Sequence, residues 1–208
     1  MQAKDVIDRA RIILQDAGAD YWAEDELPKW LTDGRMEAYR LRPDLYEKTA
    51  DATLAEGPLQ ELPDGSRRLF DVSQNVSHPK KRRITVVDDG ALSASRPAWR
   101  SGSRSAEIIH YLYNALRGSV YEVYPPARSG VQVQISYAAL PEAITAHDST
   151  VDLVQEGEHA ADLVDYVLYR AFLKEADTVP AFQARAAQHY AAFQGALTGA
   201  VATSTNPG

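Results

Sequence analysis

The hydrophobic period of this chain changes twice, and that change limits the folds it can adopt. Near both ends of the chain, apolar residues recur every three to four positions, a spacing typical of amphipathic helices. Between about Leu45 and Leu140 they instead alternate with polar residues, as in half-buried strands. The sequence therefore predicts helices at both ends and a β-rich stretch between them.

The start of the chain is predicted to be a helical hairpin that runs to Arg42. Gly18 is expected to close the first helix. The second helix begins near the acidic residues 24–26, which favour a helix N-terminus, and ends at Pro43, because a residue that precedes proline avoids the helical conformation. Its apolar stripe consists of Leu27, Trp30, Leu31, Gly34, Ala38 and Leu41.

The middle of the chain is predicted to be an antiparallel sheet. Short candidate strands follow one another with turn residues between them, which favours antiparallel pairing over βαβ units. In one of them, Val131, Val133, Ile135 and Tyr137 alternate with polar residues, so one face of this strand is expected to be buried. Asp88-Asp89-Gly90 is interpreted as a turn, and the stretch that follows it as a short helix and a loop.

After Pro141 the helical period returns in two stripes, from Leu153 to Ala171 and from Phe182 to Leu197. Packing the two terminal hairpins together would bury all of these stripes. We therefore predict an α+β fold in which N- and C-terminal helical hairpins form a four-helix bundle with an inserted antiparallel β-rich domain. The expected segments are residues 1–44, 45–141, 142–197 and a flexible tail, 198–208.

Several classes of function find no support in the sequence. The chain has no cysteine, which excludes disulfides, thiol catalysis and cysteine-bound metals. We recognise no phosphate-binding glycine loop, nucleophile elbow or metal-binding histidine motif, so no catalytic, cofactor-binding or metal residue is predicted and the chain is not expected to be an enzyme. A hydrolase built from scattered carboxylates is the enzymatic alternative. A secretory signal and an apolar span of membrane length are also not found, so a membrane partner is not expected.

Two clusters of basic residues stand out in a chain whose net charge is -7. Arg35, Arg40 and Arg42 lie on the second helix and are assigned to the sides of the apolar stripe. The second cluster precedes a predicted strand and consists of Lys80, Lys81, Arg82 and Arg83. These residues could bind phosphates, face a neighbouring protein or form a solvated loop. The acidic balance of the chain argues against general attraction to nucleic acid.

The ordered set of segments resembles the head–tail adaptor (connector) proteins of short-tailed bacteriophages, from about Ala3 to Phe193. The segments that carry the resemblance are "WAEDELPKWLTDGRMEAYRLRPDLY", "TLAEGPLQELPDGSRRLFDV", "VYEVYPPARSGVQVQISYAALP", "LVDYVLYRAFLKEAD" and "AAQHYAAF".

This resemblance implies a structural virion protein of the neck, present in the host cytoplasm during assembly. Such adaptors form a ring, generally of twelve copies, that binds the portal protein, joins it to the tail nozzle or tube, and lets DNA pass without sequence-specific binding. In a ring of this kind, the two basic clusters are candidates for contact with a neighbouring copy or the portal. Another ring-forming connector, such as a stopper or tail-completion protein, and a nucleic-acid-binding module are the alternatives.

Overall fold

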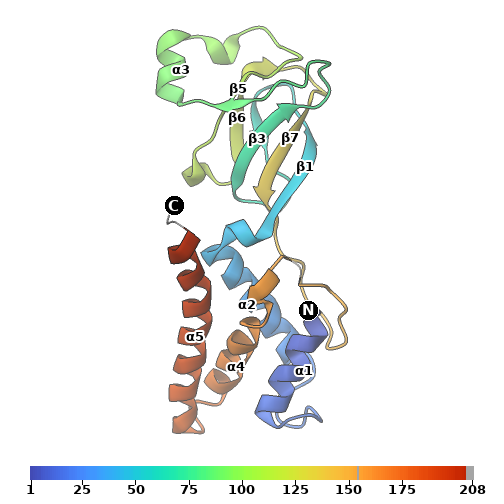
Figure 1. The fold of residues 1–208 in the computed structure, drawn as a ribbon, viewed down its shortest axis with the longest axis vertical. Coiled ribbons are helices and arrows are strands. Elements are labelled where there is room, and N and C mark those ends of the chain that lie inside the picture. The colour runs from blue at the N-terminus through green and yellow to red at the C-terminus, as the bar shows by residue number, and fades with distance from the viewer. Residues whose placement is uncertain (154, 205–208) are drawn as a thin grey trace. The chain divides into compact units, whose positions relative to one another are not determined.

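The computed structural model describes residues 1–153 and 155–204. The chain divides into two compact units, Met1–Tyr46 with Pro141–Gly208, and Glu47–Leu140 (Figure 1). We refer to them as the helical unit and the β unit. The four segments expected from the sequence remain a prediction.

The helical unit is organised around the helix α4 (Leu163–Lys174). This helix packs against α1 (Ala3–Leu14), α2 (Glu26–Leu41) and α5 (Pro180–Ser204) (Figure 1). Short 3₁₀ turns lie at Pro43–Tyr46 and Gly157–Ala160. The predicted end of the second helix before Pro43 is confirmed, and five of the six residues of its predicted stripe are buried, with Leu41 half-buried.

The predicted four-helix bundle with an inserted antiparallel domain is wrong, whereas the α+β class is confirmed. The described residues form five α-helices and two sheets, one of three strands and one of four. One strand pair, β4 with β5, is parallel. The stripe from Leu153 to Ala171 is not one helix. Leu153 and Ala160 are buried, but they precede α4, which begins at Leu163. Apolar residues in irregular segments can also fill a core, so the helical period overestimates the length of helix in this segment.

The last helix is also longer than the sequence predicted. We expected a flexible tail over 198–208, but α5 continues to Ser204. Residues 205–208 of that predicted tail lie outside the described part of the chain.

The first helix ends at Leu14, with Gln15 as its C-cap, and not at Gly18. Gln15 adopts the left-handed conformation at φ 56°, and its N–H donates to the carbonyls of Arg11 and Ile12. Asp16 is buried and accepts the backbone N–H groups of Asp20, Tyr21 and Trp22, at 2.9, 3.0 and 3.1 Å. Arg11 Nη1 lies 2.6 Å from Asp16 Oδ2. A buried carboxylate therefore organises the turn that was assigned to glycine.

The β unit consists of two sheets with the strand orders β1-β7-β3 and β2-β6-β5-β4. Their bounds are Glu47–Thr53 (β1), Gly57–Glu61 (β2), Leu69–Asn75 (β3), Thr85–Val86 (β4), His110–Leu112 (β5), Val120–Ala127 (β6) and Gln132–Ala138 (β7). A short helix, α3 (Asp89–Ser95), follows β4, with Asp88 as its N-cap, so the turn expected at Asp88-Asp89-Gly90 is the start of this helix.

The sequence did not predict β2, which contains a proline. Pro58 lies at an irregularity in the pairing of β2 with β6, between Gly57 and Leu59. Proline lacks the N–H that a central strand needs. It is tolerated in β2 because β2 is one of the two outer strands of its sheet.

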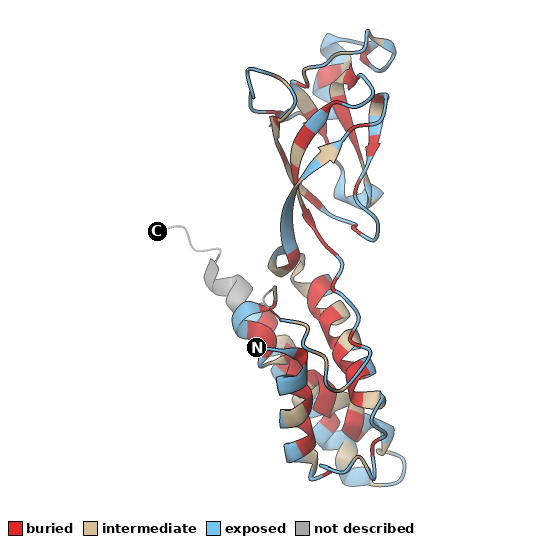
Figure 2. Cartoon of the chain, turned by 90° about the vertical axis from the view of Figure 1, so that its right-hand side faces the viewer, coloured by how far each residue is buried: buried red, intermediate tan, exposed pale blue. Residues whose placement is uncertain are grey.

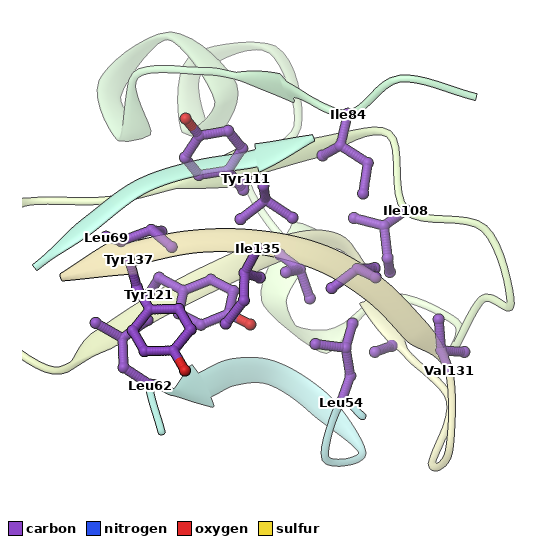
Figure 3. Close-up of a cluster of buried hydrophobic side chains, with 14 of the residues drawn as sticks. Leu54, Leu62, Leu69, Ile84, Ile108, Tyr111, Tyr121, Val131, Ile135 and Tyr137 are labelled. Carbon is purple, nitrogen blue, oxygen red and sulfur yellow. The ribbon is translucent and has the colours of Figure 1, made fainter. Parts of the chain in front are cut away.

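Side chains from both sheets share one core, shown in Figure 3. The predicted alternation in β7 is confirmed, because Val131, Val133, Ile135 and Tyr137 are all buried. Tyr121 of β6 and Tyr111 of β5 contribute their rings to the same core. In Figure 2 the strands of this unit carry buried and exposed positions along their length, as a half-buried sheet requires.

We expect Gly34→Ala to destabilise the protein, although alanine normally favours a helix by about 1 kcal/mol. A Cβ atom at Gly34 would lie 2.8 Å from Tyr166 Cδ1, where α2 approaches α4. The clash should cost about 1–3 kcal/mol in urea unfolding. The matched control is Gly195→Ala on α5, where a Cβ atom would meet nothing within 4 Å, and this variant should be at least as stable as the wild type. Equal effects of the two substitutions would contradict this packing argument.

The Asp16 turn predicts a pH dependence. Burial raises the pKa of the Asp16 carboxyl, but the three N–H donors and Arg11 together outweigh burial and hold the pKa below its usual value. A carboxyl with a lowered folded pKa stabilises the fold above its unfolded pKa, and this contribution is lost as the pH falls through the folded value. Asp16→Asn should therefore be less stable by about 1–3 kcal/mol at pH 7, and the difference should shrink below about pH 4. Urea unfolding between pH 7 and pH 3, with exposed Asp20→Asn as the control, would reveal a constant difference if this account is wrong.

Candidate interaction surface

Arg35 lies inside the helical unit and not on its surface. Its relative exposure is 2%, and it is the largest of the fully buried side chains. Nε lies 2.5 Å from Glu156 Oε1, and Nη1 donates to the carbonyl oxygen of Glu142 at 2.6 Å. The prediction that Arg35 lies off the apolar stripe is therefore wrong, and this residue is not accessible to a partner of the folded chain.

Tyr46 completes the buried cluster. Its hydroxyl lies 3.0 Å from Glu156 Oε1 and 3.1 Å from the carbonyl oxygen of Arg35. Burial, with the nearby Glu156 carboxylate, raises the pKa of Tyr46 well above its usual value, so the hydroxyl stays protonated and donates. Glu156 Oε2 has no hydrogen-bond partner within the described residues. The Arg35 guanidinium is thus the principal compensation for a buried carboxylate.

A signal for this burial was present in the sequence. Arg35 follows Leu31 by four positions and precedes Ala38 by three, and residues at these spacings share one face of a helix. We placed Arg35 off the stripe because of its charge. No comparable signal identified Glu156, which lies 121 positions further along the chain.

The other two arginines of the first cluster lie in different environments. Arg40 is exposed, with 69% of its side chain accessible, and pairs with Glu37 at 3.2 Å. Arg42 is mostly buried, binds Asp44 through Nε and Nη2, and donates to the Leu197 carbonyl on α5 at 3.2 Å. The three arginines therefore do not form one surface, and only Arg40 presents its charge to solvent.

The second basic cluster lies on a hairpin between β3 and β4. The N–H of Asn75 donates to the Arg82 carbonyl at 3.1 Å, and Asn75 Nδ2 donates to the same oxygen at 3.2 Å. Asn75 is fully buried and also binds the backbone of Ile108 through both side-chain polar atoms, at 2.8 Å each. A buried amide therefore anchors the base of the hairpin. Lys81, at φ 41°, makes the tight bend.

All four side chains of the hairpin cluster are exposed. Arg82 lies 3.4 Å from Glu107 and Arg83 lies 3.2 Å from Asp71, both at the protein surface. No ion pair joins Lys80 or Lys81 to a carboxylate in the part of the chain that the structure describes. Exposed pairs of this kind contribute little to stability, about 0–1 kcal/mol. The cluster could therefore exchange these ion pairs for contacts with a partner at a small cost in free energy.

The sequence reading missed several surface features. Apolar side chains are well exposed in both units, among them Ile12 and Ile13 on α1, Leu59 on β2, Val86 on β4 and Leu116. Exposed acidic residues also gather along β1 and β2, from Glu47 to Asp64. Ile12, Ile13 and Val86 lie in apolar runs, where the hydrophobic period does not show which side chain faces solvent, and Ile13 was placed on the buried stripe of its helix.

Other chemistry is not evident in the described residues. His159 and Asp162 share a hydrogen bond of 2.9 Å, and within residues 1–153 and 155–204 no group of three metal-ligating side chains is present. Over the same residues, no helix combines the length and apolar character needed to cross a bilayer. What the geometry offers is a charged contact surface, as in proteins that act by binding other macromolecules.

The chain belongs to the SU10 adaptor protein family, whose sequence model matches residues 1–208. This membership agrees with the resemblance to phage head–tail adaptors and makes the chain a structural adaptor of a phage virion. Such a protein acts by binding other virion components. No curated protein matches the chain closely enough to be compared with it.

We expect Arg35→Met to destabilise the fold by about 3–5 kcal/mol, because Glu156 would remain buried without its cation. The double variant Arg35→Met/Glu156→Leu should recover most of this loss, since both charges are then removed. Urea unfolding of the full chain measures both effects. Arg40→Met, at an exposed position, serves as the control and should change stability by less than about 0.5 kcal/mol. A double variant as unstable as Arg35→Met would show that the two side chains are not coupled.

Proposed function

We propose that this protein is a head–tail adaptor that assembles as a ring beneath the portal and joins the capsid to the tail. The match of the whole chain to the SU10 adaptor protein family carries this proposal. The ring, for which we expect twelve copies, would bind the portal protein on one side and the tail nozzle or tube on the other. A ring needs two different contact surfaces on each copy, one for each neighbour.

The charge of the chain supports passage of DNA through such a ring. A net charge of -7 gives the protein as a whole no attraction for the phosphate backbone. The basic hairpin is the local exception, but Arg82 and Arg83 already face Glu107 and Asp71. This pairing favours a protein contact over a DNA contact for the hairpin.

The contact residues that we propose are Arg40 and the hairpin residues Lys80, Lys81, Arg82 and Arg83. Arg35 and Arg42 are occupied within the helical unit, where they stabilise the fold. We assign binding of the portal to the helical unit and support of the tail side to the β unit.

The mass of the protein, alone and on purified heads that carry portal but lack this adaptor, tests the proposal. Wild-type protein should sediment with the heads in a fixed number of copies, whereas heads without portal should bind none. Binding only to heads that already carry another neck protein would identify a stopper or tail-completion protein instead. Binding to duplex DNA with a steep salt dependence would favour the nucleic-acid-binding alternative.

Arg40→Glu gives a more local test. If Arg40 contacts the portal or a neighbouring copy, reversing its charge should reduce head binding by about tenfold or more, since like charges at an interface cost several kcal/mol. The fold should be unaffected, because the side chain is exposed. Lys4→Glu, another exposed reversal in the helical unit, is the control. Undiminished head binding by Arg40→Glu would remove this residue from the interface.

A further inference from the structure

The strand order of the β unit separates two groups of charge. In one sheet β1 and β3 are the outer strands, and in the other sheet β2 and β4 are. β3 and β4 lie next to each other, because Gln74 forms a bridge with Arg83 and the Ile84 N–H donates to Ser73 at 3.0 Å. The combined strand order is therefore β1-β7-β3-β4-β5-β6-β2, with β3 and β4 inside it and with β1 and β2 at its two ends, joined by the short connection at residues 54–56. The chain from β1 to β2 forms one margin, and the connection between β3 and β4 forms another.

The first margin is acidic. Between residues 47 and 64 the chain has five carboxylates and one lysine, Lys48, and all five carboxylates are exposed. Glu47 accepts a hydrogen bond from Ser136, and Glu56 lies 3.7 Å from Arg104. Within the described residues the others form no ion pair. We call these residues the acidic margin: Glu47, Asp51, Glu56, Glu61 and Asp64.

The second margin is basic and is anchored at its base. It consists of the hairpin residues Lys80, Lys81, Arg82 and Arg83, and the buried Asn75 binds the carbonyl oxygen of Arg82. We call these residues the basic margin.

Each margin also exposes one aliphatic side chain. Leu59 of β2 is 54% exposed beside Glu61, and Val86 of β4 is 65% exposed shortly after Arg83. An apolar contact flanked by opposite charges is the usual composition of a protein interface.

We propose that the acidic margin of one copy binds the basic margin of the next copy, so that the β units associate head to tail. The inference rests on the ring of the proposed function and names the surfaces that would close it. A contact between two different surfaces of identical chains continues from copy to copy and closes into a ring when the rotation permits. The unpaired charges Lys80 and Lys81 on one margin, and Asp51 and Glu61 on the other, then neutralise each other.

The contact is made by side chains and not by adding strands to a sheet. β1 is an outer strand of seven residues, but the basic margin offers it only β4, which is two residues long, and β2 has Pro58 in place of a backbone donor. Both features prevent an extended backbone ladder. Charge reversal of side chains is therefore a direct test of the contact.

The test uses two full-length variants in which the unpaired charges of one margin are reversed. Asp51→Lys/Glu61→Lys makes these two positions positive, like Lys80 and Lys81, and Lys80→Glu/Lys81→Glu makes the other two negative, like Asp51 and Glu61. Each variant alone should lose at least about tenfold in association of copies, while an equimolar mixture should assemble with the copies alternating. A chain that carries all four substitutions should also assemble, because the four exchanged positions are again opposite in sign. Lys4→Glu/Arg9→Glu has the same charge change as the second variant, belongs to the helical unit and to neither margin, and should assemble as the wild type does.

Assembly is measured as the mass of the free protein and as copies bound per portal-bearing head. Full occupancy by either variant alone would overturn the head-to-tail contact and leave the adaptor proposal intact. Failure of both the mixture and the fourfold variant, with each variant folded by circular dichroism, would overturn it as well. Margin-dependent association of free wild-type protein that never binds heads would overturn the adaptor role alone. A wild type that stays monomeric with and without heads would overturn both.

Discussion

The helical unit depends on one buried charge pair, Arg35 with Glu156. Arg35 reaches from the middle of α2 to Glu156 and to the backbone of Glu142, and Tyr46 binds the same carboxylate. The chain leaves the helical unit after Tyr46 and returns to it at Pro141. Within the helical unit, the ion pair therefore contacts the chain near both crossings, through the Arg35 guanidinium at Glu142 and through the Glu156 carboxylate at Tyr46.

A pair of this kind does not stabilise a fold as a hydrophobic contact does. Removing two charges from water costs several kcal/mol per ion, and their attraction has to offset that cost. What the pair adds is direction, because a guanidinium binds acceptors only in its own plane. Apolar residues could fill the same volume but would not select the positions of Tyr46 and Glu142. We infer that the pair specifies how these segments meet.

The sequence predicted those elements whose residues have a strong local preference. The alternation in β7 and the proline after α2 act over a few residues, and the structure follows both. The sequence failed where distant residues decide. Gly18 looked like a helix cap, yet Asp16 closes the turn by accepting three backbone N–H groups. Arg35 looked like a surface residue because its partner, Glu156, is remote in the chain. The prediction of a four-helix bundle also failed because distant segments decide the packing: apolar residues of irregular segments fill part of the core.

Pro58 has a consequence for the order in which a virion could be built. A strand that accepts another strand forms a backbone ladder, and such pairing continues in aggregates whether or not a partner is present. An outer strand interrupted by proline cannot start this process. In the head-to-tail contact that we propose, association at β2 then depends on charged side chains, whose attraction is weakened by salt and has to be reinforced by a second surface. Free copies would remain separate at low concentration, and a template that gathers them would supply the local concentration at which the ring closes.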